Sequence, residues 1–348
     1  MIAKIQHIAL KGITNCVPSN VEKNEEYDLL SAAERKMLIS TTGIKERRVA
    51  EDGVCASDLC EKAALKLLNG LNWEADSVNA LIFVSQSSDY YLPATAIILQ
   101  NKLGLSKNAI AFDINLGCSG YVYGLYVLSN LMQQGQVKRA ILLCGDISTN
   151  SVNYKDKSAY PLFGDSGSAT ALEYDETAHP MTFSMGSDGS GYESIMIKGG
   201  GTRNMFHENS LKEVKVSDGI TRHELNLILD GISIFNFSIG EVPKNVKELM
   251  EKTSLSESDV EYLVLHQANK LINETIRKKL KFPKEKVPYS LDEYGNTSSG
   301  SIPLTIQTRL RNEVNDKTLI LSGFGVGLSW ASVVLTTKNV YLPELIEI

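Results

Sequence analysis

Asn115-Leu116-Gly117-Cys118-Ser119-Gly120 lies between an apolar stretch that ends near residue 114 and an amphipathic segment over residues 119–134. At such a strand-to-helix junction, a helix N-terminus places free N–H groups and partial positive charge beside the cysteine, which favours a thiolate. Gly117 and Gly120 let a substrate approach the backbone closely. The alternative for Cys118 is a buried structural cysteine, and two further junctions help to decide between these interpretations.

These two junctions carry a histidine and an asparagine. Residues 262–265 are apolar and lead to His266, which is followed by a helical pattern. Residues 294–300 form a polar, glycine-flanked turn around Asn296, ahead of another predicted helix. Either residue alone could be a core or capping residue. Together, Cys118, His266 and Asn296 supply a nucleophile, a proton-handling group and a hydrogen-bond donor, so we predict that they form a catalytic set.

An internal repeat relates these junctions. Residues 139–145 match residues 317–323 in apolar pattern and final glycine, at a separation of 178 residues, and Cys118 and Asn296 have the same separation. Upstream, residues 78–83 pair with 260–265 at a separation of 182 residues. Two related halves packed about a pseudo-twofold axis would bring the junctions to one central cleft.

The apolar periodicity predicts an α/β protein in which both halves alternate strands with helices. The expected strands are 81–85, 110–114, 140–145, 262–265, 286–290 and 318–322, and the expected helices are 57–69, 93–103, 119–134, 241–252, 267–280 and 302–313. With 348 residues, the chain exceeds the usual size of a single core, so we divide it into halves at 1–175 and 176–348. Residues 186–224 are glycine-rich and expected to be irregular.

Composition narrows the functional classes. The net charge of −6 argues against broad nucleic-acid binding, and no long apolar run or signal-peptide layout predicts a membrane segment or secretion. The five cysteines are odd in number and lack C-x-x-C spacing, so neither a disulfide framework nor a metal site is predicted, and a reducing cytoplasm is the expected location. No phosphate-cradling glycine motif stands in the required strand context. We therefore expect neither a metal nor a redox cofactor.

At these junctions the chain resembles the thiolase-fold condensing enzymes, specifically the beta-ketoacyl-acyl-carrier-protein synthase III family. The resemblance spans nearly the whole length through ordered motifs, which are Thr42–Arg47, Asn115–Gly120, Phe163–Ala169, His266–Asn269, Gly295–Ser298 and Gly323–Gly327 with Trp330. It implies a thiolase-like fold of two pseudo-twofold-related halves in an α-β-α-β-α layering. A Cys-His-Asn set is similar to that of the priming synthases.

The resemblance implies a decarboxylating Claisen condensation of an acyl thioester, acyl-CoA or acyl carrier protein, with malonyl carrier protein, in fatty-acid or specialised acyl biosynthesis. Cys118 would carry the acyl group, with its own N–H and that of Val326 forming the oxyanion hole. His266 and Asn296 would stabilise the enolate formed as carbon dioxide leaves. An acyltransferase that passes the acyl group to a hydroxyl or amine is the alternative, and a non-catalytic partner subunit is a third interpretation.

Other parts of the chain bear on substrate and partners. The family's homodimer places a residue at the position of Leu92 across the interface, where it would bound the acyl pocket. The region corresponding to 186–224 borders the substrate tunnel in the family. Arg277, Lys278 and Lys279 belong to a cationic cluster that is either a solvated helix end or a docking site for an acidic carrier protein.

Overall fold

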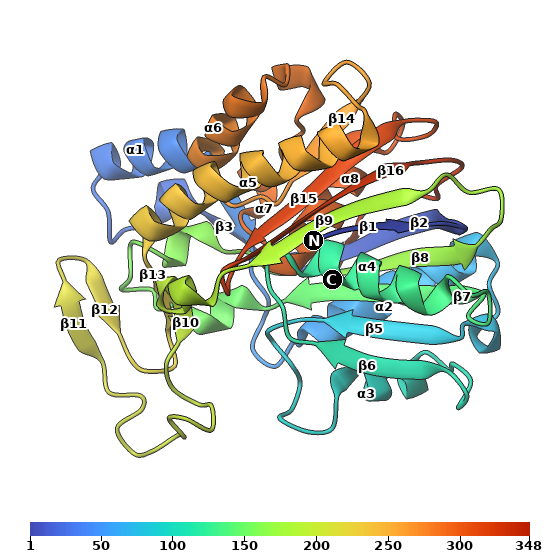
Figure 1. Ribbon diagram of the computed structural model, residues 1–348. Helices are drawn as coiled ribbons and strands as arrows, with labels where there is room; N and C mark the ends of the chain where they lie inside the picture. The colour runs from blue at the N-terminus through green and yellow to red at the C-terminus, as the bar shows by residue number, and fades with distance from the viewer.

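Two stacked sheets form the framework of the computed structural model, which describes residues 1–348 (Figure 1). The first sheet has the order β17 (Ile346–Glu347), β2 (Ile8–Val17), β8 (Ser166–Tyr174), β7 (Arg139–Asp146), β5 (Ala80–Val84) and β6 (Ile110–Ile114). The second has the order β1 (Ile2–Ile5), β9 (Met181–Ser187), β16 (Ser329–Thr336), β15 (Thr318–Gly325) and β14 (Tyr262–Leu265). In the first sheet β5 runs parallel to both β6 and β7, and in the second β14 runs parallel to β15.

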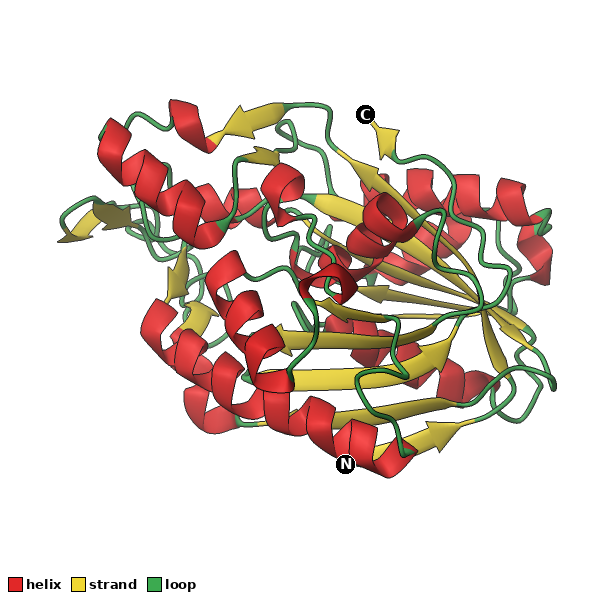
Figure 2. Cartoon of the chain, turned by 90° about the horizontal axis from the view of Figure 1, so that it is seen from above, coloured by secondary structure: helices red, strands yellow, loops and turns green.

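Helices fill three layers around these sheets (Figure 2). The central helices, α4 (Gly120–Met132) and α8 (Ser301–Leu310), contact strands of both sheets. The first sheet is covered on its outer face by α2 (Ala56–Leu71) and α3 (Thr95–Lys102), and the second by α5 (Gly231–Thr253) and α6 (Lys270–Leu280). The predicted α-β-α-β-α layering is confirmed.

The central layer is hydrophobic on both sides, because each sheet buries one face against it. Val84, Leu142 and Leu321 come from three strands and join the α4 and α8 side chains in one core cluster. The outer helices close two further clusters over the opposite sheet faces. Strands buried on both faces explain the nearly continuous apolar runs in the sequence.

Each end of the chain adds a strand to the sheet that is built mainly from the other half of the sequence. β1 pairs with β9 in the second sheet, while β17 pairs with β2 in the first. The predicted boundary between the two halves, at residue 175, falls between the end of β8 at Tyr174 and the start of β9 at Met181. The division into halves stays a prediction. The repeat strands β7 and β15 are both interior strands with a neighbour on each side, and α4 and α8 both follow loops that carry site residues.

The predicted strand at 286–290 is wrong. Lys284–Lys286 form a 3₁₀ turn, and the chain then passes the sheet edge without joining it. Pro288 has no N–H to donate, and its neighbours bond to side chains instead: the Ser290 N–H donates to Gln267 Oε1 (3.0 Å), and the Tyr289 carbonyl accepts from Arg309 Nε (2.8 Å). Hydrogen bonds to side chains thus take the place of the strand-to-strand backbone hydrogen bonds that were expected here.

Two other expectations need correction. The helix expected from residue 241 begins ten residues earlier, at Gly231, where the Asp230 side chain caps α5 and Pro243 is accommodated within it. Residues 186–224, expected to be irregular, contain three short strands. β11 (Val214–Ser217) pairs with β12 (Ile220–Arg222), and β10 (Ile195–Ile197) pairs with β13 (Leu227–Leu229), which lies just beyond the segment. No helix combines the length and apolar character that a membrane span requires.

Candidate active site

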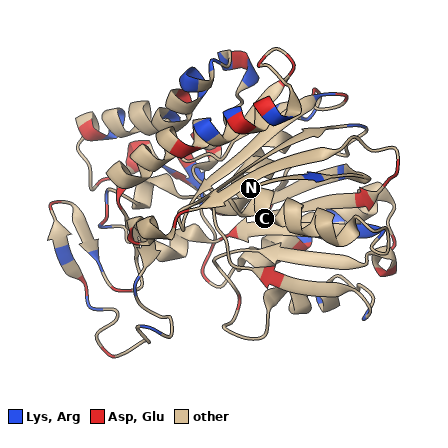
Figure 3. Cartoon of the chain, in the orientation of Figure 1, with Lys and Arg blue, Asp and Glu red and all other residues tan.

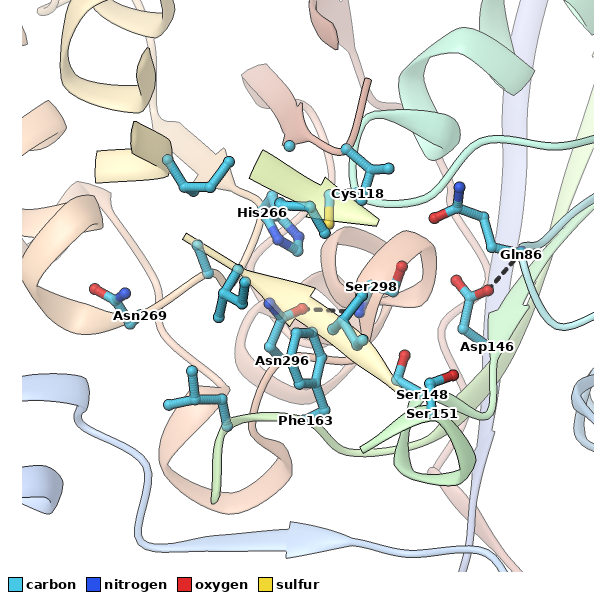
Figure 4. A pocket seen from close by; sticks show the side chains of 18 of the residues that line it. Gln86, Cys118, Asp146, Ser148, Ser151, Phe163, His266, Asn269, Asn296 and Ser298 are labelled. Carbon is cyan, nitrogen blue, oxygen red and sulfur yellow. Dashed lines mark hydrogen bonds between the residues drawn. The ribbon is translucent and has the colours of Figure 1, made fainter. Parts of the chain in front are cut away.

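One cavity of about 230 Å³ contains the three residues that the junctions predicted (Figure 4). Cys118, His266 and Asn296 all line it and are 7%, 1% and 8% exposed. The carboxyl ends of parallel strands meet at one edge of each sheet, so the loops after β6 and β14 deliver Cys118 and His266 to the same place. Asn296 arrives from the loop between α7 (Leu291–Tyr294) and α8.

Cys118 is a buried thiol held between backbone groups. Burial raises its pKa to about 11, and the negative charge of Asp146 adds to this increase. Hydrogen bonds from the Val326 backbone, the Ser298 side chain and the Cys118 backbone oppose it. The helix N-terminus was expected to favour a thiolate, and these donors do lower the pKa, but burial outweighs them and the net shift favours the thiol. The thiol proton must leave as the sulfur attacks.

The glycine-rich end of β15 and the turn that follows it pack tightly against the sulfur. A Cβ atom on Gly325 would lie 2.8 Å from Cys118 Cβ and 2.9 Å from Cys118 Sγ. Gly323 is equally constrained, because its Cβ would lie 2.8 Å from the Cys118 carbonyl oxygen. Only glycine permits this approach, which brings the Val326 N–H to the sulfur.

His266 is a neutral imidazole. Burial, partly offset by a hydrogen bond with the Ser298 backbone, lowers its pKa to about 3. Its Nδ1 lies 2.7 Å from Ser301 Oγ, which itself accepts the Gln267 N–H (3.4 Å). The Ser301 hydroxyl can donate to Nδ1, which would leave the ring proton on Nε2, the tautomer that the proposed function below requires.

Asn296 is held in position by hydrogen bonds of its backbone and of its side-chain oxygen, Oδ1. Its N–H donates to the Leu162 carbonyl (2.8 Å), and its carbonyl accepts the Gly164 N–H (3.1 Å). Its Oδ1 accepts the Ser298 N–H (2.9 Å), as the dashed line in Figure 4 shows. Because Oδ1 is held there, the Nδ2 group is the part of the carboxamide left to donate into the cavity.

Two sequence motifs that are not catalytic candidates support this loop. Arg47, almost fully buried, donates to the Phe163 carbonyl (2.8 Å) and pairs with Glu22 (2.5 Å). A Cβ on Gly164 would lie 2.2 Å from the Tyr294 carbonyl oxygen, so this crossing requires glycine. The Thr42–Arg47 and Phe163–Ala169 motifs therefore converge on the Asn296 loop and hold it in position.

Sequence reasoning missed Asp146, Ser298 and Ser301. The buried Asp146 carboxylate accepts hydrogen bonds from the Gln86 N–H (2.7 Å) and from the Ser299 hydroxyl (2.8 Å), and so ties the two halves together. Asp146 is the last residue of the repeated strand β7. A charged residue at the end of an otherwise apolar strand was the sequence signal that could have marked it as a site residue. Ser298 and Ser301 lie in the polar turn that was assigned only to helix capping.

The remaining predicted site residues lie outside the cavity. Leu92 is 81% exposed on the loop before α3 and does not line the cavity of its own chain. Lys278 and Lys279 are exposed on α6, whereas Arg277 is partly buried, pairs with Glu274 (2.8 Å) and donates to the Phe282 carbonyl (2.7 Å). No group of three or more His, Cys, Asp or Glu side chains is placed to hold a metal ion.

Known proteins share this architecture. Sequence models described as 3-oxoacyl-[acyl-carrier-protein] synthase III and as its C-terminal part match residues 112–189 and 250–337. A Campylobacter jejuni relative is 34% identical over 336 residues, covering 95% of this chain and 92% of its own. A beta-ketoacyl-[acyl-carrier-protein] synthase III of Clostridioides difficile is 32% identical, covering 94% and 97%. The crystal structure of a 3-oxoacyl-(acyl-carrier protein) synthase of Burkholderia xenovorans superposes with a TM-score of 0.93 at 37% identity, covering 100% of this chain and 99% of that one.

Proposed function

The chain belongs to the 3-oxoacyl-[acyl-carrier-protein] synthase III family, and on that premise we propose that it condenses an acyl thioester with malonyl carrier protein to give a 3-oxoacyl carrier protein. The observation that carries the proposal is the convergence of Cys118, His266 and Asn296 on one cavity, with the Val326 N–H beside the sulfur. The chain is an acyl-transferring enzyme in fatty-acid biosynthesis or a related acyl pathway.

In the first half-reaction, Cys118 Sγ attacks the carbonyl carbon of the acyl thioester. The carbonyl oxygen becomes an oxyanion, which the N–H groups of Cys118 and Val326 stabilise. The carbon–sulfur bond to the carrier then breaks, and its thiol leaves with the proton that Cys118 gives up. The product is a thioester on Cys118.

In the second half-reaction, malonyl carrier protein loses carbon dioxide in the same cavity. The developing enolate oxygen accepts hydrogen bonds from His266 Nε2–H and Asn296 Nδ2–H, and a neutral histidine suits this role because it donates without becoming charged. The enolate carbon attacks the acyl-Cys118 carbonyl, the carbon–sulfur bond to Cys118 breaks, and the departing thiolate takes up one proton from solvent to restore the thiol. Two half-reactions at one sulfur predict ping-pong kinetics.

The test is intact-protein mass spectrometry after mixing the protein with acyl-CoA and acyl carrier protein donors, with Cys118→Ala as the control. A mass increase that depends on Cys118, followed by carbon dioxide release on adding malonyl carrier protein, supports the condensation. Acyl loading without carbon dioxide release would favour transfer to a hydroxyl or amine. No loading from any donor would overturn the proposal and favour the partner-subunit interpretation.

Ser301→Ala is expected to lower the decarboxylation rate about tenfold, because the hydroxyl that keeps the proton on His266 Nε2 is lost. Cys118 loading should stay close to the unmodified rate. The matched control is Thr305→Val on the same helix, which removes a buried hydroxyl bonded to the Ser301 carbonyl but not to His266. If both variants lose decarboxylation equally, Ser301 has only a structural role. Stopped-flow measurement of carbon dioxide release, alongside thermal unfolding, makes the comparison.

The docking proposal for the carrier protein now depends on Lys278 and Lys279, because Arg277 is paired with Glu274. Basic side chains gather along α6 in Figure 3. Lys278 lies about 13 Å along the helix from Asn269 at the cavity, at 1.5 Å per residue. These exposed lysines would attract an acidic carrier protein toward the cavity mouth.

The double variant Lys278→Glu/Lys279→Glu should raise the KM for malonyl carrier protein about tenfold at low salt, and the effect should shrink as salt is added. The matched control is Lys247→Glu/Lys252→Glu on α5, which changes the net charge equally. An unchanged KM in the α6 variant, or an equal rise in both, would contradict docking at α6.

We also propose that the protein is a cytoplasmic homodimer. The exposed edge strand β6 and the exposed side chains of Tyr91 and Leu92 support pairing at this edge, and the five free cysteines suit a reducing compartment. Light scattering coupled to size exclusion tests the dimer, and a monomer at micromolar concentration would contradict it.

A further inference from the structure

The cavity around Cys118 is apolar on one side and polar on the other. Figure 4 places Gln86, Asp146, Ser148 and Ser151 on one side of Cys118, and Asn269 on the opposite side. The apolar lining comes from β10, β13, α5 and the start of α6, and includes Ile195, Ile197, Leu227, Leu229, Ile234 and Ile272. A plain hydrocarbon chain would match only this apolar lining.

The polar side is built at the carboxyl ends of β5 and β7. Ser148 and Ser151 begin and end one 3₁₀ turn, and residues three apart in such a turn share a face. Both line the cavity, and neither hydroxyl has a hydrogen-bond partner within the protein. The Gln86 carboxamide likewise has no such partner, since only its backbone N–H is bonded, to Asp146.

The turn that carries the two serines is held in place, and Gln86 is an exposed side chain at the same cavity. The middle of the 3₁₀ turn is fixed by Asp165, which accepts both the Thr149 N–H (3.1 Å) and the Thr149 hydroxyl (2.5 Å). Gln86 Oε1 lies against the residue before the nucleophile, because a Cβ on Gly117 would be 2.4 Å from it. Cys118, Ser148, Ser151 and Gln86 line one cavity, so an acyl group on Cys118 that extends to this side enters the part lined by these three polar side chains.

The chemistry of the lining selects the substituent. Hydroxyl and carboxamide groups both donate and accept hydrogen bonds, as an alcohol does. No lysine or arginine lines the cavity, so a carboxylate would lack a counter-charge. The Asp146 carboxylate is already occupied by Ser85, Gln86 and Ser299, so it offers little to an ammonium group. An alkyl chain would displace water from the half-buried Ser148 and Ser151 hydroxyls without replacing its hydrogen bonds, at a cost in binding.

We propose that the acyl group accepted by Cys118 carries a hydroxyl, which Ser148, Ser151 and Gln86 bind; this rests on the acyl-Cys118 intermediate of the proposed function. The hydroxyl takes no part in bond making. Sγ still attacks the thioester carbonyl, the carrier thiol leaves with the proton, and the hydroxyl is carried unchanged into the condensation product. The substrate class is therefore a hydroxyacyl thioester.

The test compares Cys118 loading from N-acetylcysteamine thioesters of butyrate, 3-hydroxybutyrate and 4-hydroxybutyrate, followed by intact-protein mass spectrometry. These donors share one short thiol, so a difference between them reports on the acyl group alone. We expect at least one hydroxylated donor to load about fivefold to tenfold faster than butyrate. Ser148→Ala and Ser151→Ala should each reduce this ratio several-fold.

Ser254→Ala is the control, because it removes an exposed hydroxyl at the end of α5 that does not line the cavity, and it should leave the ratio as it was. The proposal is overturned if butyrate loads as fast as both hydroxylated donors. It is also overturned if the serine variants slow all three donors equally, since the hydroxyls would then bind the shared carrier arm. Either result leaves the condensation intact, whereas no loading from any donor, including acyl carrier protein, overturns the proposed function itself.

Discussion

His266→Ala and Asn296→Ala are each expected to slow carbon dioxide release from malonyl carrier protein by about 10²–10³-fold while Cys118 still takes an acyl group. The physical reason is that, in the proposed mechanism, both side chains donate to the enolate oxygen and neither belongs to the oxyanion hole that serves acylation. With one donor gone, negative charge would develop in a buried cavity beside a single remaining hydrogen bond.

The two half-reactions can be measured separately. Intact-protein mass spectrometry follows Cys118 loading, and trapping of labelled carbon dioxide follows decarboxylation. Asn296→Asp is the matched control for shape, because it keeps the Oδ1 acceptor for the Ser298 N–H but removes the Nδ2 donor. It should therefore fail in decarboxylation as Asn296→Ala does. Normal condensation in any of these variants would show that the enolate is stabilised elsewhere.

The sequence predicted the strands and the site to different extents for a physical reason. Apolar periodicity and the repeat placed Cys118 and Asn296 at equivalent junctions, because buried strands and helix entrances leave a local pattern. The stretch 286–290 was also expected to be a strand yet forms none, because Pro288 lacks an N–H and the hydrogen-bond partners of Tyr289 and Ser290 are side chains brought by tertiary contacts. The local pattern of apolar residues therefore predicts whether a segment is buried better than it predicts whether the segment pairs with other strands in a sheet.

The sequence predicted which residues form the site better than it predicted their protonation and hydrogen-bond partners. The helix N-terminus suggested a thiolate at Cys118, but desolvation depends on the full enclosure of the sulfur and raises its pKa instead. Ser301 could not be recognised as the partner of His266, because the two lie 35 residues apart and meet only after the second half folds. Hydrogen-bond partners and pKa shifts of this kind can be recognised only when the three-dimensional packing around the residues is known.

Gly325→Ala is expected to reduce Cys118 loading by about 10²–10³-fold, because the new methyl group would lie 2.9 Å from the sulfur. Either the sulfur moves from its place beside the Val326 N–H, or the turn retreats and the oxyanion loses that donor. Both changes act on the first half-reaction. Loading rates from a single acyl donor, measured by intact-protein mass spectrometry, give the size of the loss.

A glycine replacement in this turn also strains the backbone, so the loss must be separated from poor folding. Gly327→Ala is the matched control: Gly327 has φ of +138° against +155° at Gly325, but its Cβ would meet Ser329 rather than Cys118. We expect both variants to lower the thermal midpoint, and only Gly325→Ala to lose loading at temperatures where both remain folded. If Gly325→Ala loads at the unmodified rate, the turn does not contact the reacting sulfur, and Val326 cannot supply the oxyanion donor. Equal loss in both variants would instead make the turn a structural requirement and would remove this support for the oxyanion hole.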